Sequence, residues 1–179
     1  KVIDIVRNIQ KHGYEAYLVG GCVRDMLFEK QPNDWDICSN ATPKQLFDVF
    51  EQCGYKYHTV GIEFGTITAI VDNEEYEVTT YRSETEYTDG RHPDIVEFVD
   101  SIHEDLKRRD FTINAMAFDP ISDKLIDDFG GVDDLSNGII RAVGNPAERF
   151  NEDYVRILRA LRFAIRYQFD IDRETSLCM

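Results

Sequence analysis

The stretch YLVGGCVRDMLFEKQPNDWDIC, residues 17–38, decides the fold of this chain. It predicts a short apolar strand, a Gly-Gly turn, a helix, a loop around a proline and a second strand. The second strand carries Asp34 and Asp36. Because side chains two residues apart in a strand point to the same face, we expect these two carboxylates side by side, with Trp35 and Ile37 facing the core.

The acid pair and the Gly-Gly turn predict complementary binding sites. Mg²⁺ commonly takes one or two carboxylates and fills its other positions with waters and substrate phosphates. Gly20 and Gly21 let backbone N–H groups approach a phosphate, and the start of the following helix favours an anion. An isolated Asp-x-Asp is more often a solvated turn, and Gly-Gly alone is weaker still. In this combination and order they predict a metal beside a polyphosphate.

The composition is that of a globular protein with unevenly placed charge. The chain has 179 residues, 42% of them hydrophobic, and a formal net charge of −14. That sum argues against a nucleic-acid surface, yet basic residues gather at 107–109 and along 141–166, whereas 72–105 is acidic. No apolar run approaches the roughly 18 residues of a membrane span, and no signal peptide is recognisable, so we expect a cytoplasmic protein. The last residues read as a continuing helical region, which suggests a truncated chain.

A third acid is predicted to join the pair. Strand patterns follow at 55–60, 65–72 and 75–82, the last two joined as a hairpin. Within YEVTTYR, Glu77 and Thr79 share one face of the strand. A third carboxylate beside the acid pair suits a two-metal phosphoryl-transfer site, whereas the plainer alternative is an exposed strand glutamate.

Polar residues inside apolar surroundings mark the middle of the chain. Residues 83–93 lack apolar periodicity and predict a surface loop. Ser101 then begins a short helix that runs into LKRRDFTINAMAF. There Arg109, Asp110 and Asn114 must find partners, because an unpaired buried polar group is costly. An internal Arg109–Asp110 ion pair would satisfy them, and so would a polar ligand.

A long helix is expected from Asn145, with Pro146 in its first turn. Its apolar stripe consists of Tyr154, Leu158, Leu161 and Ile165. Asp153 and Arg156 lie on an adjoining face, and from their spacing alone we expect an ordinary surface ion pair.

The ordered motifs GGCVRD, DWDIC, EVTTYR and RRDFTINA, with EDxxR at 152–156, resemble those of the class II tRNA nucleotidyltransferases, the CCA-adding enzymes. These share a polymerase-β-like catalytic fold with bacterial poly(A) polymerases. The resemblance spans about residues 10–170. It implies an α+β head at 1–142, with a mixed sheet of about five strands and helices on one side. The start of a helical neck would follow at 143–179.

The resemblance also implies an activity and a role for each motif. The activity is Mg²⁺-dependent, template-independent addition of CMP and AMP, from CTP and ATP, to the 3′ end of tRNA. Asp34 and Asp36 would hold the metal, with Glu77 as the third catalytic acid, and loop 83–93 is associated with the switch from C to A addition. The implied nucleotide-binding residues are Gly20, Gly21 and Arg24 for the phosphates, Arg109 and Asp110 for the sugar, Asp153 and Arg156 for the base, and Arg159 and Arg162.

Other functions share these motifs. A bacterial poly(A) polymerase has the same set, and so do enzymes that add only CC or only A. From a different class, the chain could be an inactive module that binds nucleotides or RNA. The acid pair argues against such a module, because binding alone requires no paired carboxylates facing a phosphate pocket.

Overall fold

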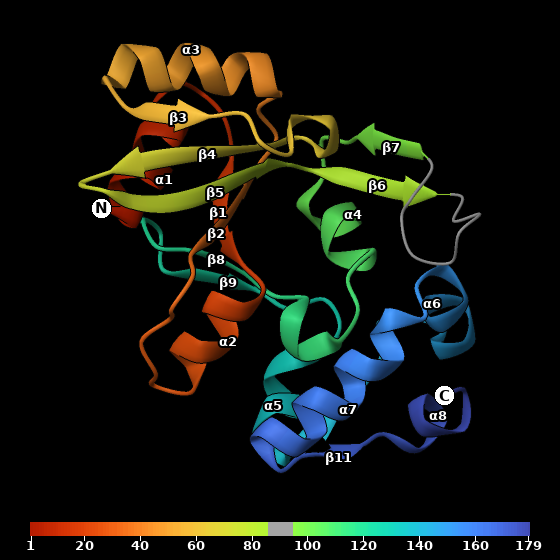
Figure 1. Ribbon diagram of the computed structural model, residues 1–179. Coiled ribbons are helices and arrows are strands. Elements are labelled where there is room, and N and C mark those ends of the chain that lie inside the picture. The colour runs from red at the N-terminus through yellow and green to blue at the C-terminus, as the bar shows by residue number, and fades with distance from the viewer. Residues whose placement is uncertain (86–94) are drawn as a thin grey trace.

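Seven strands form the central mixed sheet of the computed structural model, which describes residues 1–85 and 95–179 (Figure 1). Their order across the sheet is β3-β4-β5-β2-β1-β8-β9. The strands are β1 (Ala16–Val19), β2 (Asp36–Ser39), β3 (Lys56–His58), β4 (Thr66–Val71), β5 (Glu74–Thr80), β8 (Ala117–Asp119) and β9 (Lys124–Ile126). The sequence indicated the first five. The three-residue hairpin arms β8 and β9 carry no strand pattern and were missed.

Two smaller strand pairs lie apart from this sheet. β6 (Arg82–Thr85) and β7 (Ile95–Phe98) form an antiparallel hairpin. β10 (Ile139–Ile140) and β11 (Asp170–Ile171) pair in parallel near the C-terminus. The loop expected at 83–93 is therefore strand up to residue 85, and the rest of that expectation, in 86–94, lies outside the described residues.

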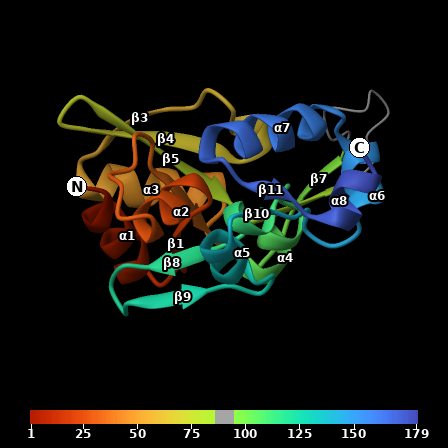
Figure 2. The same ribbon diagram turned by 90° about the horizontal axis from the view of Figure 1, so that it is seen from below.

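Helices cover both faces of the sheet, not one. They are α1 (Val2–Lys11), α2 (Gly21–Leu27), α3 (Pro43–Cys53), α4 (Ile102–Lys107), α5 (Gly131–Asn137), α6 (Pro146–Glu152), α7 (Val155–Tyr167) and α8 (Arg173–Leu177), with 3₁₀ turns η1 (Ile62–Phe64) and η2 (Thr112–Asn114). In the view from below, α7 lies at the top of the picture and α5 and β9 lie in its lower half (Figure 2). Within the described part of the chain, no helix has the length and apolarity needed to cross a membrane.

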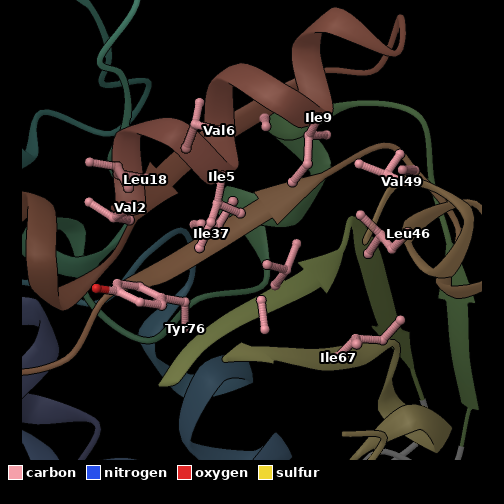
Figure 3. Packing of buried hydrophobic residues seen from close by; sticks show 14 of the residues in the cluster. Val2, Ile5, Val6, Ile9, Leu18, Ile37, Leu46, Val49, Ile67 and Tyr76 are labelled. Carbon is pink, nitrogen blue, oxygen red and sulfur yellow. The ribbon is translucent and has the colours of Figure 1, made fainter. Parts of the chain in front are cut away.

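The largest core lies between the sheet and the pair α1 and α3. The buried residues of α1 recur with helical spacing and meet Leu46 and Val49 of α3 above Ile37 and Ile67 of the sheet (Figure 3). On the opposite face Leu106 of α4 packs in a second cluster that contains Val19 of β1 and Cys38 of β2, the residues that follow Leu18 and Ile37 in the chain. Successive strand residues point to opposite faces, so the central strands need apolar cover on both sides.

The start of β2 differs from the sequence prediction. β1 and β2 are antiparallel, with Leu18 opposite Ile37. The chain leaves β1 through the turn at Gly20, so no residue of β1 remains to pair with Asp34. β2 therefore begins at Asp36, and Asp34 lies in an exposed bend before it. Trp35 and Ile37 do pack toward the core, as predicted.

The long helix expected from Asn145 is two helices, α6 and α7. Asp153 has extended backbone angles, φ −144° and ψ 104°, and its carboxylate accepts from the N–H of Val155 at 2.9 Å. A local side-chain acceptor of this kind competes with helix continuation. The predicted apolar stripe is also wrong, since Leu158 and Ile165 are 66% and 79% exposed. α7 packs inward through Ile157, Ala160, Phe163 and Ala164.

Candidate active site

A cavity of about 620 Å³ gathers most of the predicted site residues. Its lining contains Gly20, Gly21, Arg24, Asp36, Arg109, Asp110, Asp153, Arg156, Arg159 and Arg162. Arg108, Asn114, Val155 and Phe163 complete the lining. Asp34 and Glu77 stand outside the lining. A separate cavity of about 500 Å³, near α4 and β9, contains none of the predicted residues.

The Gly-Gly turn brings backbone close to a guanidinium. Gly20 has φ +70° and donates its N–H to the Met116 carbonyl at 3.1 Å. A Cβ atom at this position would lie 3.0 Å from Nη1 of Arg109. Glycine satisfies both the left-handed backbone and the close approach. The turn therefore places Gly20, Gly21 and Arg109 at one end of the cavity.

Asp36 lies near each of the other two predicted acids. In the parallel pairing of β2 with β5, Asp36 is opposite Glu77. Burial raises the pKa of Asp36, the negative charges of Glu77 and Asp34 raise it further, and Arg109 opposes them. A cation at this position would relieve that repulsion.

The donor set fits a metal that takes few protein ligands. Within residues 1–85 and 95–179, no three His, Cys, Asp or Glu side chains are gathered into a metal-holding group. Mg²⁺ commonly uses one or two carboxylates and completes its shell with water and substrate phosphates. Asp34 and Asp36 are the carboxylates that fit this description, with Glu77 opposite Asp36.

Arg24 has protein partners that the sequence did not reveal. Its Nε and Nη2 donate to Oδ1 of Asp25 at 3.0 and 2.8 Å, and its Nη1 donates to Oδ1 of Asn114 at 2.5 Å. The guanidinium also lies 5.5 and 5.1 Å from the ring centroids of Phe163 and Tyr167. Arg24 thus connects α2 to α7 in the cavity wall, in addition to facing the cavity.

An Arg109–Asp110 ion pair, one of the two alternatives left open by the sequence, is not the arrangement that the structure shows. Arg109 pairs instead with the buried carboxylate of Asp105, Nη2 to Oδ2 at 3.0 Å, and Asp110 accepts from Nε of Arg159 at 2.7 Å and Nδ2 of Asn114 at 3.2 Å. Burial lowers the pKa of Arg109, but Asp105, Cys38 and Asp36 together raise it more, so the net shift is upward.

Arg109 retains an unused donor. Its buried Nε has no hydrogen-bond partner among the described residues. A buried N–H without a partner costs free energy unless a ligand supplies the acceptor. Because Arg109 lines the cavity, that ligand would bind there.

Asp105 is a site residue that sequence reasoning missed. It is fully buried and its carboxylate contacts Arg108, Arg109 and the backbone N–H of Arg82. The signal was present, because an acid three and four residues before two arginines on one helix faces both of them. The attraction of both guanidinium groups outweighs burial, and the pKa of Asp105 is lowered.

Asp153 and Arg156 lie on the same cavity, but the structure pairs Arg156 with Glu152. Arg156 Nη1 donates to Oε2 of Glu152 at 2.6 Å and to the Arg149 carbonyl at 3.1 Å, and its Nη2 reaches the Arg108 carbonyl at 3.4 Å. Asp153 lies at the break between α6 and α7, where one carboxylate oxygen accepts from Val155. The helix break therefore turns Asp153 toward the cavity.

Comparison with known proteins agrees with this geometry. The family model of the poly A polymerase head domain matches residues 16–141. CCA-adding enzymes of Enterococcus faecalis and Streptococcus gordonii are 49% and 48% identical to the chain, over 96% and 100% of its length and 41% and 44% of their own. The chain spans less than half the length of these curated relatives.

Solved structures give the same result. The crystal structure of Bacillus stearothermophilus CCA-adding enzyme in complex with CTP superposes with a TM-score of 0.88 at 38% identity, covering 99% of this chain and 41% of that one. The crystal structure of a tRNA nucleotidyltransferase complexed with a primer tRNA and an incoming ATP analogue superposes with a TM-score of 0.79 at 38% identity. The match covers 97% of this chain and 48% of that one. With this sheet, this cavity and a family match over most of its length, the chain belongs to the poly A polymerase head domain family.

Proposed function

We propose that the protein adds CMP and AMP, taken from CTP and ATP, to the 3′ end of tRNA and releases pyrophosphate. The observation that carries this proposal is the convergence of three features on one cavity: the Gly-Gly turn, Asp36, and the pair Asp153 and Arg156. The printed names of the relatives and solved structures, which include CTP, an ATP analogue and a primer tRNA, support it.

The reaction that we propose depends on Mg²⁺ held by Asp34 and Asp36, with Glu77 as the third acid. When bound, Mg²⁺ lowers the pKa of the attacking 3′ hydroxyl and offsets negative charge on the leaving pyrophosphate. The raised pKa of Asp36 and the repulsion among the three acids support this assignment.

The nucleotide would lie along the cavity from the Gly-Gly turn to the break between α6 and α7. Gly20 and Gly21 offer backbone to the phosphates, with Arg24 in the wall beside them. Arg109 offers its unpaired Nε to a phosphate or sugar oxygen, and Asp110, which Arg159 holds in place, offers a carboxylate to the ribose hydroxyls. Arg162, exposed at the rim, would face the phosphates.

Base selection would come from Asp153 and Arg156. Asp153 accepts from the exocyclic amine of cytosine or adenine, and Arg156 donates to the adjacent ring nitrogen. Uracil and guanine place a carbonyl where the amine would be. That carbonyl and the Asp153 carboxylate are both acceptors, and facing each other they would cost about 1–3 kcal/mol. The fixed position of Arg156 against Glu152 and two backbone carbonyls supports this role, because a preorganised donor selects better than a mobile one.

The domain division and the compartment belong to the same proposal. We propose a catalytic head at 1–142 followed by the start of a helical neck at 143–179, and the end of the family match at residue 141 supports that boundary. Because tRNA and nucleoside triphosphates are the proposed substrates, we also propose the cytoplasm as the compartment.

Calorimetric titration with CTP, ATP, GTP and UTP in the presence of Mg²⁺ tests the proposed function. We expect CTP and ATP to bind at least about tenfold more tightly than UTP and GTP, which corresponds to about 1.4 kcal/mol. In the isosteric variant Asp153→Asn this preference is expected to disappear, whereas Asp170→Asn, an exposed acid beyond α7, should retain it. Binding of ATP alone would instead favour a poly(A) or A-adding enzyme, and binding of none of the four would refute the proposal.

A further inference from the structure

The hairpin β6–β7 reaches the cavity wall through an ion pair that the proposed mechanism does not use. Glu84 on β6 is nearly buried, with 8% of its side chain exposed. Its Oε1 accepts from Nη2 of Arg82 at 2.7 Å and from Nη1 of Arg108 at 3.0 Å. Glu84 thus connects a hairpin outside the main sheet to Arg108, which lines the nucleotide cavity.

Arg108 is held from two sides. Its Nε and Nη2 both donate to Oδ1 of Asp105, at 3.1 and 3.0 Å, and its Nη1 donates to Oε1 of Glu84. Its backbone carbonyl accepts from Nη2 of Arg156 at 3.4 Å. The same residue therefore has its guanidinium withdrawn into the wall and its carbonyl beside the base-selecting arginine.

The charge in this wall depends on Glu84. Three arginines, Arg82, Arg108 and Arg109, share two carboxylates, those of Glu84 and Asp105. Burial lowers the pKa of Arg82, and the nearby positive charge of Arg108 lowers it further, so the two guanidinium groups repel each other. Without Glu84, the guanidinium groups of Arg82 and Arg108 would be left beside Asp105, which already pairs with Arg109.

We propose that Glu84 is a positioning residue for base selection, because it holds the Arg108 guanidinium against the wall and out of the nucleotide-binding space. A guanidinium has five N–H donors and no acceptor. If Arg108 turned into the cavity, it would donate to the carbonyl of uracil or guanine, the group that Asp153 excludes. This inference rests on the proposed function and adds a third determinant to its specificity.

The test compares the affinities for CTP and UTP in Glu84→Gln, which keeps the shape of the side chain and removes its charge. The ratio of the two dissociation constants, measured with Mg²⁺, is expected to shift toward UTP by about fivefold, the worth of one hydrogen bond of about 1 kcal/mol. The matched control is Asp172→Asn, which removes the ion pair with Arg141 at 2.7 Å, outside the cavity lining. Its ratio should equal that of the unmodified protein.

A double-mutant cycle separates positioning from general loosening of the fold. If Glu84 acts through Arg108, the double variant Glu84→Gln with Arg108→Gln should show the same ratio as Arg108→Gln alone. If Glu84→Gln does not fold, Glu84→Asp withdraws the carboxylate from Arg108 and should shift the ratio in the same direction. An unchanged ratio in the folded Glu84 variant, or additive effects in the cycle, would overturn the inference and leave the proposed function intact. Failure of the unmodified protein to bind any nucleotide would overturn both.

Discussion

Asp36 shows how one residue acquires a functional character from its neighbours. It is the first residue of β2, it is partly buried, and it lies opposite Glu77 on the adjacent strand. Burial and the two nearby acids raise its pKa, so its ionised form is held at a cost in free energy. Clusters of this kind are concentrated at functional sites, where a bound cation recovers that cost.

Replacing Asp36 by Asn should abolish nucleotidyl transfer without unfolding the protein. Loss of the carboxylate removes a metal ligand, and we expect transfer to a tRNA 3′ end to fall by at least about a thousandfold. The thermal midpoint should not fall, because the change also removes repulsion from Glu77. The control is Asp48→Asn on the exposed side of α3, which should leave both quantities unchanged. Activity retained in Asp36→Asn would remove the metal assignment.

Packing between elements, rather than local sequence, places the nucleotide-binding wall. α5 begins at Gly131, where a Cβ atom would lie only 2.4 Å from the Thr112 carbonyl oxygen and 2.9 Å from Cγ of Met116. Thr112 also donates from its hydroxyl to Asp134 of α5 at 2.7 Å. Asn114 belongs to η2 and hydrogen-bonds to both Arg24 and Asp110. The packing of α5 against η2 therefore fixes the position of Asn114 in the cavity wall.

Gly131→Ala should therefore destabilise the protein by about 1–3 kcal/mol, as overpacking in a rigid interior does. The obstacle is a backbone carbonyl, which cannot turn aside as a side chain can. Gly130→Ala is the matched control, because its Cβ would meet nothing within 4 Å and only its left-handed backbone, φ +73°, opposes the change. Urea denaturation should show the larger loss at Gly131. Equal losses would contradict this account of the packing.

At the level of elements, the sequence predicted what depends on local periodicity and capping. It located β1, the Gly-Gly turn and the start of α6, where the Asn145 side chain accepts from the N–H groups of Ala147 and Glu148. It failed at β8 and β9, which are too short to show a pattern, and at the break before α7, which depends on one hydrogen bond of Asp153. The partner of Asp110 was out of reach for another reason, since Arg159 lies far along the chain.

The whole molecule combines an acidic chain with a cavity rich in arginine. The formal net charge is −14, yet six arginines line the cavity against three carboxylates. Low-dielectric walls focus the field of such a cluster, so a nucleoside triphosphate is attracted to the cavity and not to the surface as a whole. The net charge alone argued against nucleic-acid binding, and the arrangement of the arginines in space shows why the sum misleads.

Stability of the whole fold should decrease at alkaline pH. Burial raises the pKa of Cys22 from 9.0 to about 11 and that of Tyr76 from 10.0 to about 12. Between the unfolded and folded values the native state binds more protons than the unfolded chain, so the free energy of unfolding falls as pH rises through about 9–12. Urea midpoints at pH 8 and pH 10.5 measure this, and Cys22→Ala should reduce the difference. A midpoint independent of pH would contradict it.

The parallel register of β2 and β5 makes the acidic site a late product of folding. Asp34 and Asp36 are close in the chain, but Glu77 comes opposite Asp36 only when β5 has paired with β2, and α3, β3 and β4 lie between these two strands in the sequence. When two strands are far apart in the sequence, closing the loop between them costs entropy before their contacts can compensate for it. The placement of Glu77 opposite Asp36 therefore marks completion of this part of the sheet, and a nascent chain that ends before β5 would lack it.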